Sequence, residues 1–89
     1  MKQVVFTSPF KRDYKKRQRE KGLDVLLGEV LDTISAAVPL PVKFRDHALK
    51  GNYFGCRECH LKPDLLLIYI ESTTEIRLMR LASHSELFS

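Results

Sequence analysis

The feature that most constrains this fold is an unbroken apolar run, Leu65-Leu66-Leu67-Ile68-Tyr69-Ile70. It lies in the second half of the chain, where β-branched and aromatic residues are frequent and apolar residues tend to alternate with polar ones. Successive side chains of a strand point to opposite faces of a sheet. A strand that is apolar on both faces belongs in the middle of a sheet, so we expect residues 65–70 to form a central strand.

Three further strands are expected around it. The short β-branched and aromatic segment at residues 2–7 indicates a first strand, and residues 53–60 and 75–82 indicate two others. Residues 71–74 connect the central strand to the last one as a hairpin loop, so these two strands are expected to be antiparallel.

Two helices are expected between the first strand and the rest. Ser8 is a suitable N-cap and Pro9 suits the first helical position, so a helix is predicted over residues 9–21, with Gly22 ending it. The next helix begins at Leu23, because apolar residues then recur every three or four positions up to Val38.

A long connection starts at Pro39 and runs to about Asn52, because each proline disfavours the α conformation in the residue before it. The element order is therefore β-α-α-β-β-β. We expect a single α+β domain over residues 1–89, with both helices on one face of a mainly antiparallel sheet.

The charge of the chain is unevenly distributed. Residues 1–22 hold eight basic and two acidic residues, a net charge of +6, whereas the whole chain carries +4. A basic block of this kind favours a polyanionic partner such as nucleic acid, although a solvated helix face is the commoner meaning of a charge run. No apolar run approaches the roughly 20 residues that span a bilayer, and we expect a cytoplasmic protein with reduced Cys56 and Cys59.

Polar residues of chemical interest gather after Pro41. They come from four short segments, Asp46-His47, Arg57-Glu58-Cys59-His60, Pro63-Asp64 and Arg80-Leu81-Ala82-Ser83-His84. An antiparallel sheet can bring such strand ends and loops to one rim, where loops on a rigid scaffold supply function. Taken one by one, these residues are more often structural than catalytic.

Four spaced motifs in this region resemble a known family. The segment RDHALKGNYFGCRECHLKPDLLLIY, Arg45 to Tyr69, is similar to the pattern DHxLxG, GxRxxH and PDxxLxY of the YafQ branch of the RelE/ParE toxins, and RLASHSELF, Arg80 to Phe88, resembles their RxGxHxxLF ending. The resemblance covers essentially the whole chain. It implies a RelE-like, microbial ribonuclease-like fold and metal-free cleavage of mRNA in the ribosomal A site, with a cognate antitoxin as inhibitor and a toxin that is monomeric when free.

The resemblance also implies roles for individual residues. His47, His60, Asp64 and His84 become the catalytic set, Arg80 a phosphate contact and Phe88 a base-stacking contact. The RNA-binding residues expected from the basic block and from these motifs are Lys15, Lys16, Arg19, Lys50, Arg57, Arg80 and Phe88. The chain departs from the pattern in two places. Leu65 stands where many relatives have an aromatic residue, and Ala82 replaces the usual glycine, which is expected to restrict the backbone before His84.

The residue types suit RNA cleavage, because RNA carries its own nucleophile in the 2′-hydroxyl. The enzyme has to take that proton, stabilise the charged phosphorus intermediate and protonate the leaving 5′ oxygen. We assign Asp64 as the base, with His47 as the competing candidate, and His84 as the acid, while His60 and Arg80 stabilise the phosphate oxygens. The products are then a 2′,3′-cyclic phosphate and a 5′-hydroxyl.

Three other interpretations compete with this one. Cys56-Arg57-Glu58-Cys59-His60 matches the attachment motif of c-type haem, but thiols three residues apart in a strand point to opposite faces. The same cysteines and the histidines are possible zinc ligands, although the spacing is not that of a standard finger. The third alternative is a non-enzymatic toxin like ParE, or a plain nucleic-acid-binding protein, on the same fold.

Overall fold

A five-stranded mixed sheet forms the centre of the computed structural model, which describes residues 2–88. The strand order is β1-β5-β4-β3-β2, so β4 is central as predicted. β1 pairs with β5 in parallel, and the other neighbours are antiparallel. The strands are β1 (Gln3–Phe6), β2 (His47–Ala48), β3 (Arg57–Lys62), β4 (Leu65–Glu71) and β5 (Glu75–Ala82). The predicted α+β class is confirmed, and β5 has the predicted bounds.

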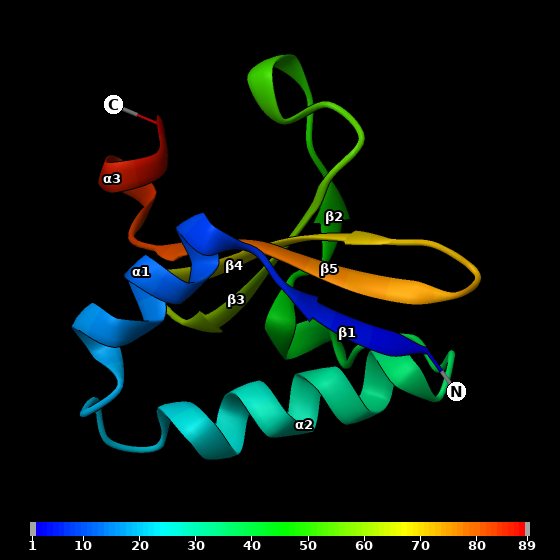
Figure 1. Cartoon of the computed structure of the whole chain (residues 1–89), viewed down its shortest axis with the longest axis horizontal. Helices are drawn as coiled ribbons and strands as arrows, with labels where there is room; N and C mark the ends of the chain where they lie inside the picture. The colour runs from blue at the N-terminus through cyan, green and yellow to red at the C-terminus, as the bar shows by residue number, and fades with distance from the viewer. Residues whose placement is uncertain (1, 89) are drawn as a thin grey trace.

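Three α-helices pack on this sheet (Figure 1). They are α1 (Ser8–Arg17), α2 (Leu23–Ser35) and α3 (His84–Phe88), and two short 3-10 turns, η1 (Val42–Phe44) and η2 (Gly51–Tyr53), lie in the long connection. The sequence did not predict β2 or α3. Both are very short, two and five residues, and give almost no periodic signal.

The predicted helix over residues 9–21 is wrong at both ends. Its N-cap is Thr7 rather than Ser8, because the Thr7 hydroxyl accepts a hydrogen bond from the Phe10 backbone N–H at 3.3 Å. It ends at Arg17, where the chain turns and the Glu20 N–H donates to the Arg17 carbonyl. Gly22 (φ +78°) is the N-cap of α2 instead of ending α1.

Two other predicted boundaries also move. α2 ends at Ser35 rather than reaching Val38, because Ala37 takes a left-handed conformation (φ +59°). The strand predicted over residues 53–60 begins only at Arg57, because the Cys56 N–H closes a turn on the Tyr53 carbonyl, with Gly55 at φ +93°.

Apolar side chains cover both faces of the sheet. On one face, α1 and α2 pack against alternate residues of β4, whose members on this side are Leu65, Leu67 and Tyr69. On the other face, Leu66 and Ile68 pack with Leu87 of α3. The expectation that the predicted helices share one face is confirmed, and α3 adds a small second layer on the opposite face.

α1 also covers part of a sheet edge. β1 pairs with β5 only as far as Leu78, which leaves the last residues of β5 without a strand on that side. The buried Asp13 of α1 fills this position, since its carboxylate accepts a hydrogen bond from the Leu81 N–H at 2.9 Å. A basic helix is thereby attached directly to the strand that leads to His84.

The longest helix in residues 2–88, α2, has 13 residues and is too short to cross a bilayer.

Candidate active site

Two of the predicted catalytic histidines meet at a buried carboxylate. The pairing of β2 with β3 places His47 opposite Glu58, and His60 follows two residues later on the same strand face. Nε2 of His47 lies 3.4 Å and Nε2 of His60 lies 3.3 Å from the same oxygen, Oε1 of Glu58. We call His47, Glu58 and His60 the strand group. Glu58 was not predicted as a site residue and occurs in the sequence only as part of the segment Arg57-Glu58-Cys59-His60.

Asp46 fixes the segment that carries His47. Its carboxylate accepts hydrogen bonds from both Nε and Nη2 of Arg57, and one from the Tyr69 hydroxyl at 2.6 Å. The hydrogen bond with Asp46 raises the pKa of Arg57, and burial, followed by the same carboxylate, raises the pKa of Tyr69. Arg57, predicted to bind RNA, is therefore held by this carboxylate and positions His47.

The His47 ring has a defined tautomer. Its Nδ1 lies 2.7 Å from the Arg45 carbonyl oxygen, which can only accept a hydrogen bond. Nδ1 therefore carries a proton and donates it to this carbonyl, and Nε2 is the nitrogen that faces Glu58. Arg45 itself takes a left-handed conformation (φ +49°), which bends the chain just before Asp46.

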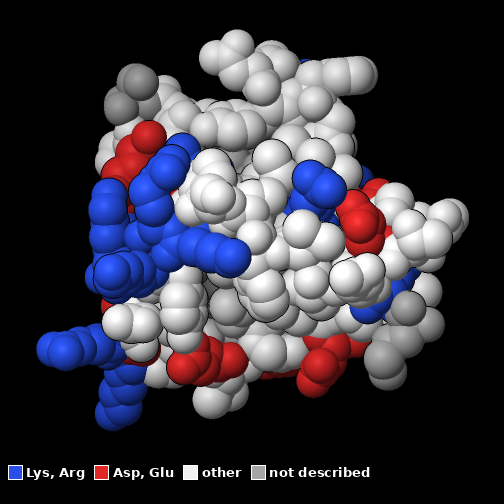
Figure 2. Space-filling view, in the orientation of Figure 1, with Lys and Arg blue, Asp and Glu red and all other residues white. Residues whose placement is uncertain are grey.

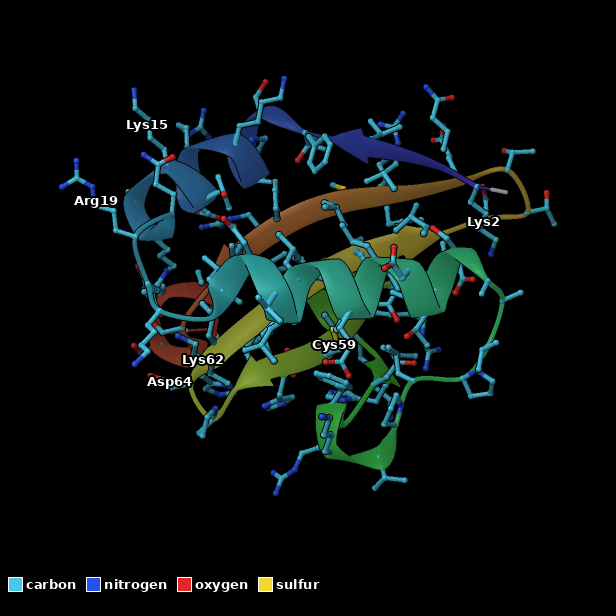
Figure 3. The ribbon with its side chains drawn as sticks, turned by 90° about the horizontal axis from the view of Figure 1, so that it is seen from below. Lys2, Lys15, Arg19, Cys59, Lys62 and Asp64 are labelled. Carbon is cyan, nitrogen blue, oxygen red and sulfur yellow. The ribbon has the colours of Figure 1, made fainter. Side chains whose placement is uncertain are left out.

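The other two predicted catalytic residues form a second set at α3. Asp64, in the turn between β3 and β4, accepts a hydrogen bond from the His84 backbone N–H at 3.1 Å. The His84 ring lies 4.9 Å from the Phe88 ring, and Phe88 meets Tyr53 edge-on at 5.6 Å (centroid distances). We call Asp64, His84 and Phe88 the α3 group. Figure 3 shows Asp64 at the end of the sheet beside α3.

α3 is held in place by a capping box. The Ser83 hydroxyl accepts from the Glu86 N–H, and the Glu86 carboxylate accepts from the Ser83 N–H at 2.8 Å. Arg17 of α1 forms an ion pair with the same carboxylate. The hydrogen bonds with Ser83, assisted by Arg17, lower the pKa of Glu86 to about 2.

The two groups lie at the same end of the sheet. His60, Leu66 and Ala82 are side by side on β3, β4 and β5, and Ala82 is only two residues before His84. Two strand spacings separate His60 from Ala82, roughly 10 Å. Within residues 2–88, no hydrogen bond or ion pair joins the strand group to the α3 group.

Both departures from the family pattern fit the fold. Ala82 is a buried residue of β5 and has no positive φ, so the expected restriction before His84 is wrong. An extended strand accepts alanine as readily as glycine. Leu65 is also buried, in the core beneath α1 and α2, where it packs as an apolar residue.

Arg80, the predicted phosphate contact, is bound to α1. Its Nε lies 2.7 Å and its Nη2 lies 3.2 Å from the two carboxylate oxygens of Asp13. These hydrogen bonds raise the pKa of Arg80. The Arg80 side chain is 32% exposed, so part of it remains accessible to a phosphate.

The basic block becomes an exposed cationic surface. Figure 2 shows Lys and Arg side chains gathered over α1 on the face that is visible. Lys15, Lys16 and Arg19 are exposed, and within the described part of the chain none of them forms an ion pair. Figure 3 shows Lys15 and Arg19 projecting away from the body of the protein. Lys50 is exposed too, in the connection before η2.

A second basic region adjoins His60. A hollow of about 320 Å³ lies between η1 and the end of β3, with His60 in its wall. Three cationic residues also line it, namely Lys43, Arg45 and Lys62. None of these three was predicted as a site residue, because they are scattered along the chain and do not form a block.

The two cysteines lie on opposite faces of the sheet, as expected. Cys59 packs in the core under α2 (Figure 3), and Cys56 belongs to the cluster on the α3 side. This placement contradicts the haem interpretation, because one porphyrin edge cannot reach both thiols. Among residues 2–88, no three His, Cys, Asp or Glu side chains are arranged to hold a metal ion.

Comparison with known proteins places this architecture among small bacterial toxins. A family model described as a bacterial toxin of type II toxin-antitoxin system, YafQ, matches residues 2–89. The mRNA interferase toxin YafQ of Escherichia coli strain K12 is 31% identical over 86 residues, covering 96% of this chain and 94% of that protein. The chain therefore belongs to the YafQ family of type II toxin-antitoxin toxins.

Solved structures agree with this assignment. A copper-bound mutant toxin from Helicobacter pylori is 42% identical, with a TM-score of 0.91 over 99% of this chain and 100% of that chain. YafQ in the E. coli DinJ-YafQ complex is 28% identical, with a TM-score of 0.86 and full coverage of both chains.

Proposed function

We propose that this toxin is an endoribonuclease that cuts mRNA on the ribosome without a metal ion. The main support is the placement of His47, His60, Asp64 and His84 at one end of the sheet, beside exposed basic surfaces. The E. coli relative named mRNA interferase toxin supports the same activity. A toxin that acts only by protein contact has no need for four proton-transfer groups in one place.

The proposed reaction proceeds by attack of the RNA's own 2′-hydroxyl. Asp64 takes the hydroxyl proton, the 2′ oxygen forms a bond to phosphorus, and the bond to the 5′ oxygen breaks while His84 donates a proton to that oxygen. His47 remains the competing base, since its Nδ1 is committed to Arg45 and only Nε2 is left to accept a proton. The products are a 2′,3′-cyclic phosphate and a 5′-hydroxyl.

The charged intermediate needs positive neighbours. His60 and Arg80 supply them in this proposal, and both are already held in place, by Glu58 and Asp13 respectively. Groups fixed before the reaction stabilise developing charge without paying for reorganisation. Phe88 is 40% exposed, so an RNA base can stack on its ring.

The direct test is induction of the protein in a bacterial host, followed by primer extension on an abundant transcript. We expect cuts in phase with codons, because the ribosome presents the message one codon at a time. Uncut transcripts in cells whose growth has stopped would argue for a toxin that acts by protein contact, as ParE does. Purified ribosomes programmed with a labelled message, with and without EDTA, test metal independence.

Ribosome binding is proposed for the basic surface of α1. Replacing Lys15, Lys16 and Arg19 by Glu should weaken association and flatten its salt dependence, by roughly 0.7 to 0.9 in logarithmic slope for each phosphate that the variant no longer binds. Arg77→Glu is the control, because Arg77 lies on β5 near the hairpin loop, away from α1. An unchanged slope in the triple variant would remove α1 from the interface.

Inhibition is proposed to come from an acidic antitoxin segment that folds on this surface and covers the candidate active site. The basic residues of α1 favour such a partner. Beside them, an apolar groove of about 470 Å³ runs between α1 and α2, lined by Phe6, Phe10, Tyr14, Leu27 and Leu31 among others. The DinJ-YafQ complex shows that the E. coli toxin assembles with a partner protein.

Co-expression with the small open reading frame adjacent to the toxin gene should rescue growth. Rescue should weaken when Leu31, in the wall of the groove, is replaced by Glu, and should survive Val25→Glu, a change on the exposed side of α2. Light scattering of the free, cytoplasmic toxin should give the mass of a monomer.

A further inference from the structure

The strand group contains a carboxylate that no proposed reaction step uses. Glu58 is buried, with a side-chain exposure of 6%, and lies within β3 rather than in a loop. A buried carboxylate is costly unless an opposite charge or hydrogen-bond donors compensate it. Among residues 2–88, its only ion-pair partners are the imidazoles of His47 and His60.

The contact is arranged symmetrically. Oε1 of Glu58 meets Nε2 of both rings, and the ring centroids of the two histidines are 6.3 Å apart. Both ring nitrogens therefore lie within ion-pair distance of one oxygen. His47 is already turned by the bond from its Nδ1 to Arg45, so Glu58 completes the positioning of that ring.

The groups around Glu58 leave the compensation of its buried charge to the two histidines. From β2, His47 faces it, and from its own strand His60 does so. The nearby cation, Arg57, pairs with Asp46 rather than with Glu58. Cys59 points to the other side of the sheet, where burial, and after it the charges of Asp46 and Glu58, raise the pKa of its thiol to about 12.

We propose that Glu58 is a positioning residue that orients His47 and His60 together, with Nε2 of both rings beside its Oε1. Rings fixed in this way before the reaction need no reorganisation when RNA binds. This inference rests on the proposed RNA cleavage for its kinetic consequence, but the ring geometry can be measured without RNA.

The first measurement is spectroscopic. Ring nitrogen shifts of the three histidines are recorded in the intact protein for the natural chain, Glu58→Gln, Glu58→Asp and the control Glu75→Gln, which lies on β5 and pairs with Arg77. Glu58→Gln should change the ring nitrogen signals of His47 and His60 and leave those of His84 unchanged. Glu58→Asp should restore part of the original signals, and the control should change none of them.

The second measurement is single-turnover cleavage on programmed ribosomes, across the pH range in which imidazoles titrate. We expect Glu58→Gln to cleave about 10- to 100-fold more slowly, the scale of a misplaced group, and with an altered pH profile. Glu58→Asp should recover part of the rate. Unfolding curves establish that each variant is folded, and if Glu58→Gln does not fold, Glu58→Asp carries the comparison.

The outcomes separate the two proposals. Unchanged His47 and His60 spectra in a folded Glu58→Gln protein overturn the positioning role, whatever the activity. Altered spectra in a protein whose natural form does not cleave RNA would support the positioning role and remove the proposed function.

Discussion

The strand group and the α3 group differ in how they are held. His47 and His60 are fixed by backbone pairing of β2, β3 and β4 and by a buried carboxylate. His84 and Phe88 belong to a five-residue helix held by one capping box, one ion pair to Arg17, the hydrogen bond from the His84 N–H to Asp64 and the core residue Leu87. Half of the candidate site is thus part of the sheet, while the other half depends on a short helix with few contacts.

The largest effect should come from the chemistry of the α3 group. His84→Gln is expected to cut the single-turnover rate by a factor of about 100 to 10,000, because it removes one acid-base group. Binding to ribosomes should stay unchanged, since the His84 backbone N–H that Asp64 holds is kept. Near-normal cleavage by a folded His84→Gln protein would transfer the acid role to His60.

A smaller loss should follow from Phe88→Ala. Stacking of a base on an aromatic ring is worth about 1 to 3 kcal/mol, which corresponds to roughly 5- to 150-fold in rate. The rate falls because the substrate is placed less well. No acid-base group is changed, so the pH profile should keep its shape. Phe88→Tyr is the matched control, because it keeps an aromatic ring at this position. A changed pH profile in Phe88→Ala would show that the ring also acts on His84.

The strand group can be weakened through its anchor. Tyr69→Phe removes the hydrogen bond to Asp46, and we expect the free energy of unfolding to fall by about 1 to 3 kcal/mol. The activity of the folded protein should fall as well, since Asp46 precedes His47. Chemical denaturation and single-turnover cleavage measure the two effects, and full activity in a destabilised variant would mean that Arg57 alone suffices to hold the segment.

The smallest effect is expected for Glu86→Gln, which weakens the hold on α3. The carboxylate is largely exposed, so the loss of stability at neutral pH should be below about 1 kcal/mol. Because the folded pKa of Glu86 is about 2 and its ordinary value is 4.5, this contribution is present above about pH 4.5 and disappears as the pH falls toward 2. The natural and variant proteins should therefore unfold alike near pH 2. A difference that persists there would rule out the carboxylate charge as its cause.

The sequence predicted the sheet better than it predicted the connections. The apolar run at residues 65–70 and the hairpin after it were sufficient to place β4 at the centre and β5 beside it. Gly22 was misassigned because a glycine with positive φ can end one helix or precede the next, and only the turn at Arg17 decides between them. α3 and β2 depend on tertiary contacts that no periodic pattern encodes.

For the candidate site, the sequence named residues but did not predict how they are arranged. The four motifs named His47, His60, Asp64 and His84, and the structure brings them together as two pairs. The contact of Glu58 with His47 could not be predicted, because it depends on the pairing of a two-residue strand, β2, with β3. Arg57 and Arg80 were predicted to bind RNA, and the sequence did not indicate that Asp46 and Asp13 hold them through contacts distant in sequence.

The placement of the cysteines has a practical consequence for experiments on this protein. Cys59 is fully covered and Cys56 nearly so, and burial raises the pKa of both thiols. Thiolates, the species that react with maleimides, are therefore scarce at neutral pH. A cysteine introduced at an exposed position of α1, such as Lys11, can be labelled with a fluorophore while both native thiols are left in place.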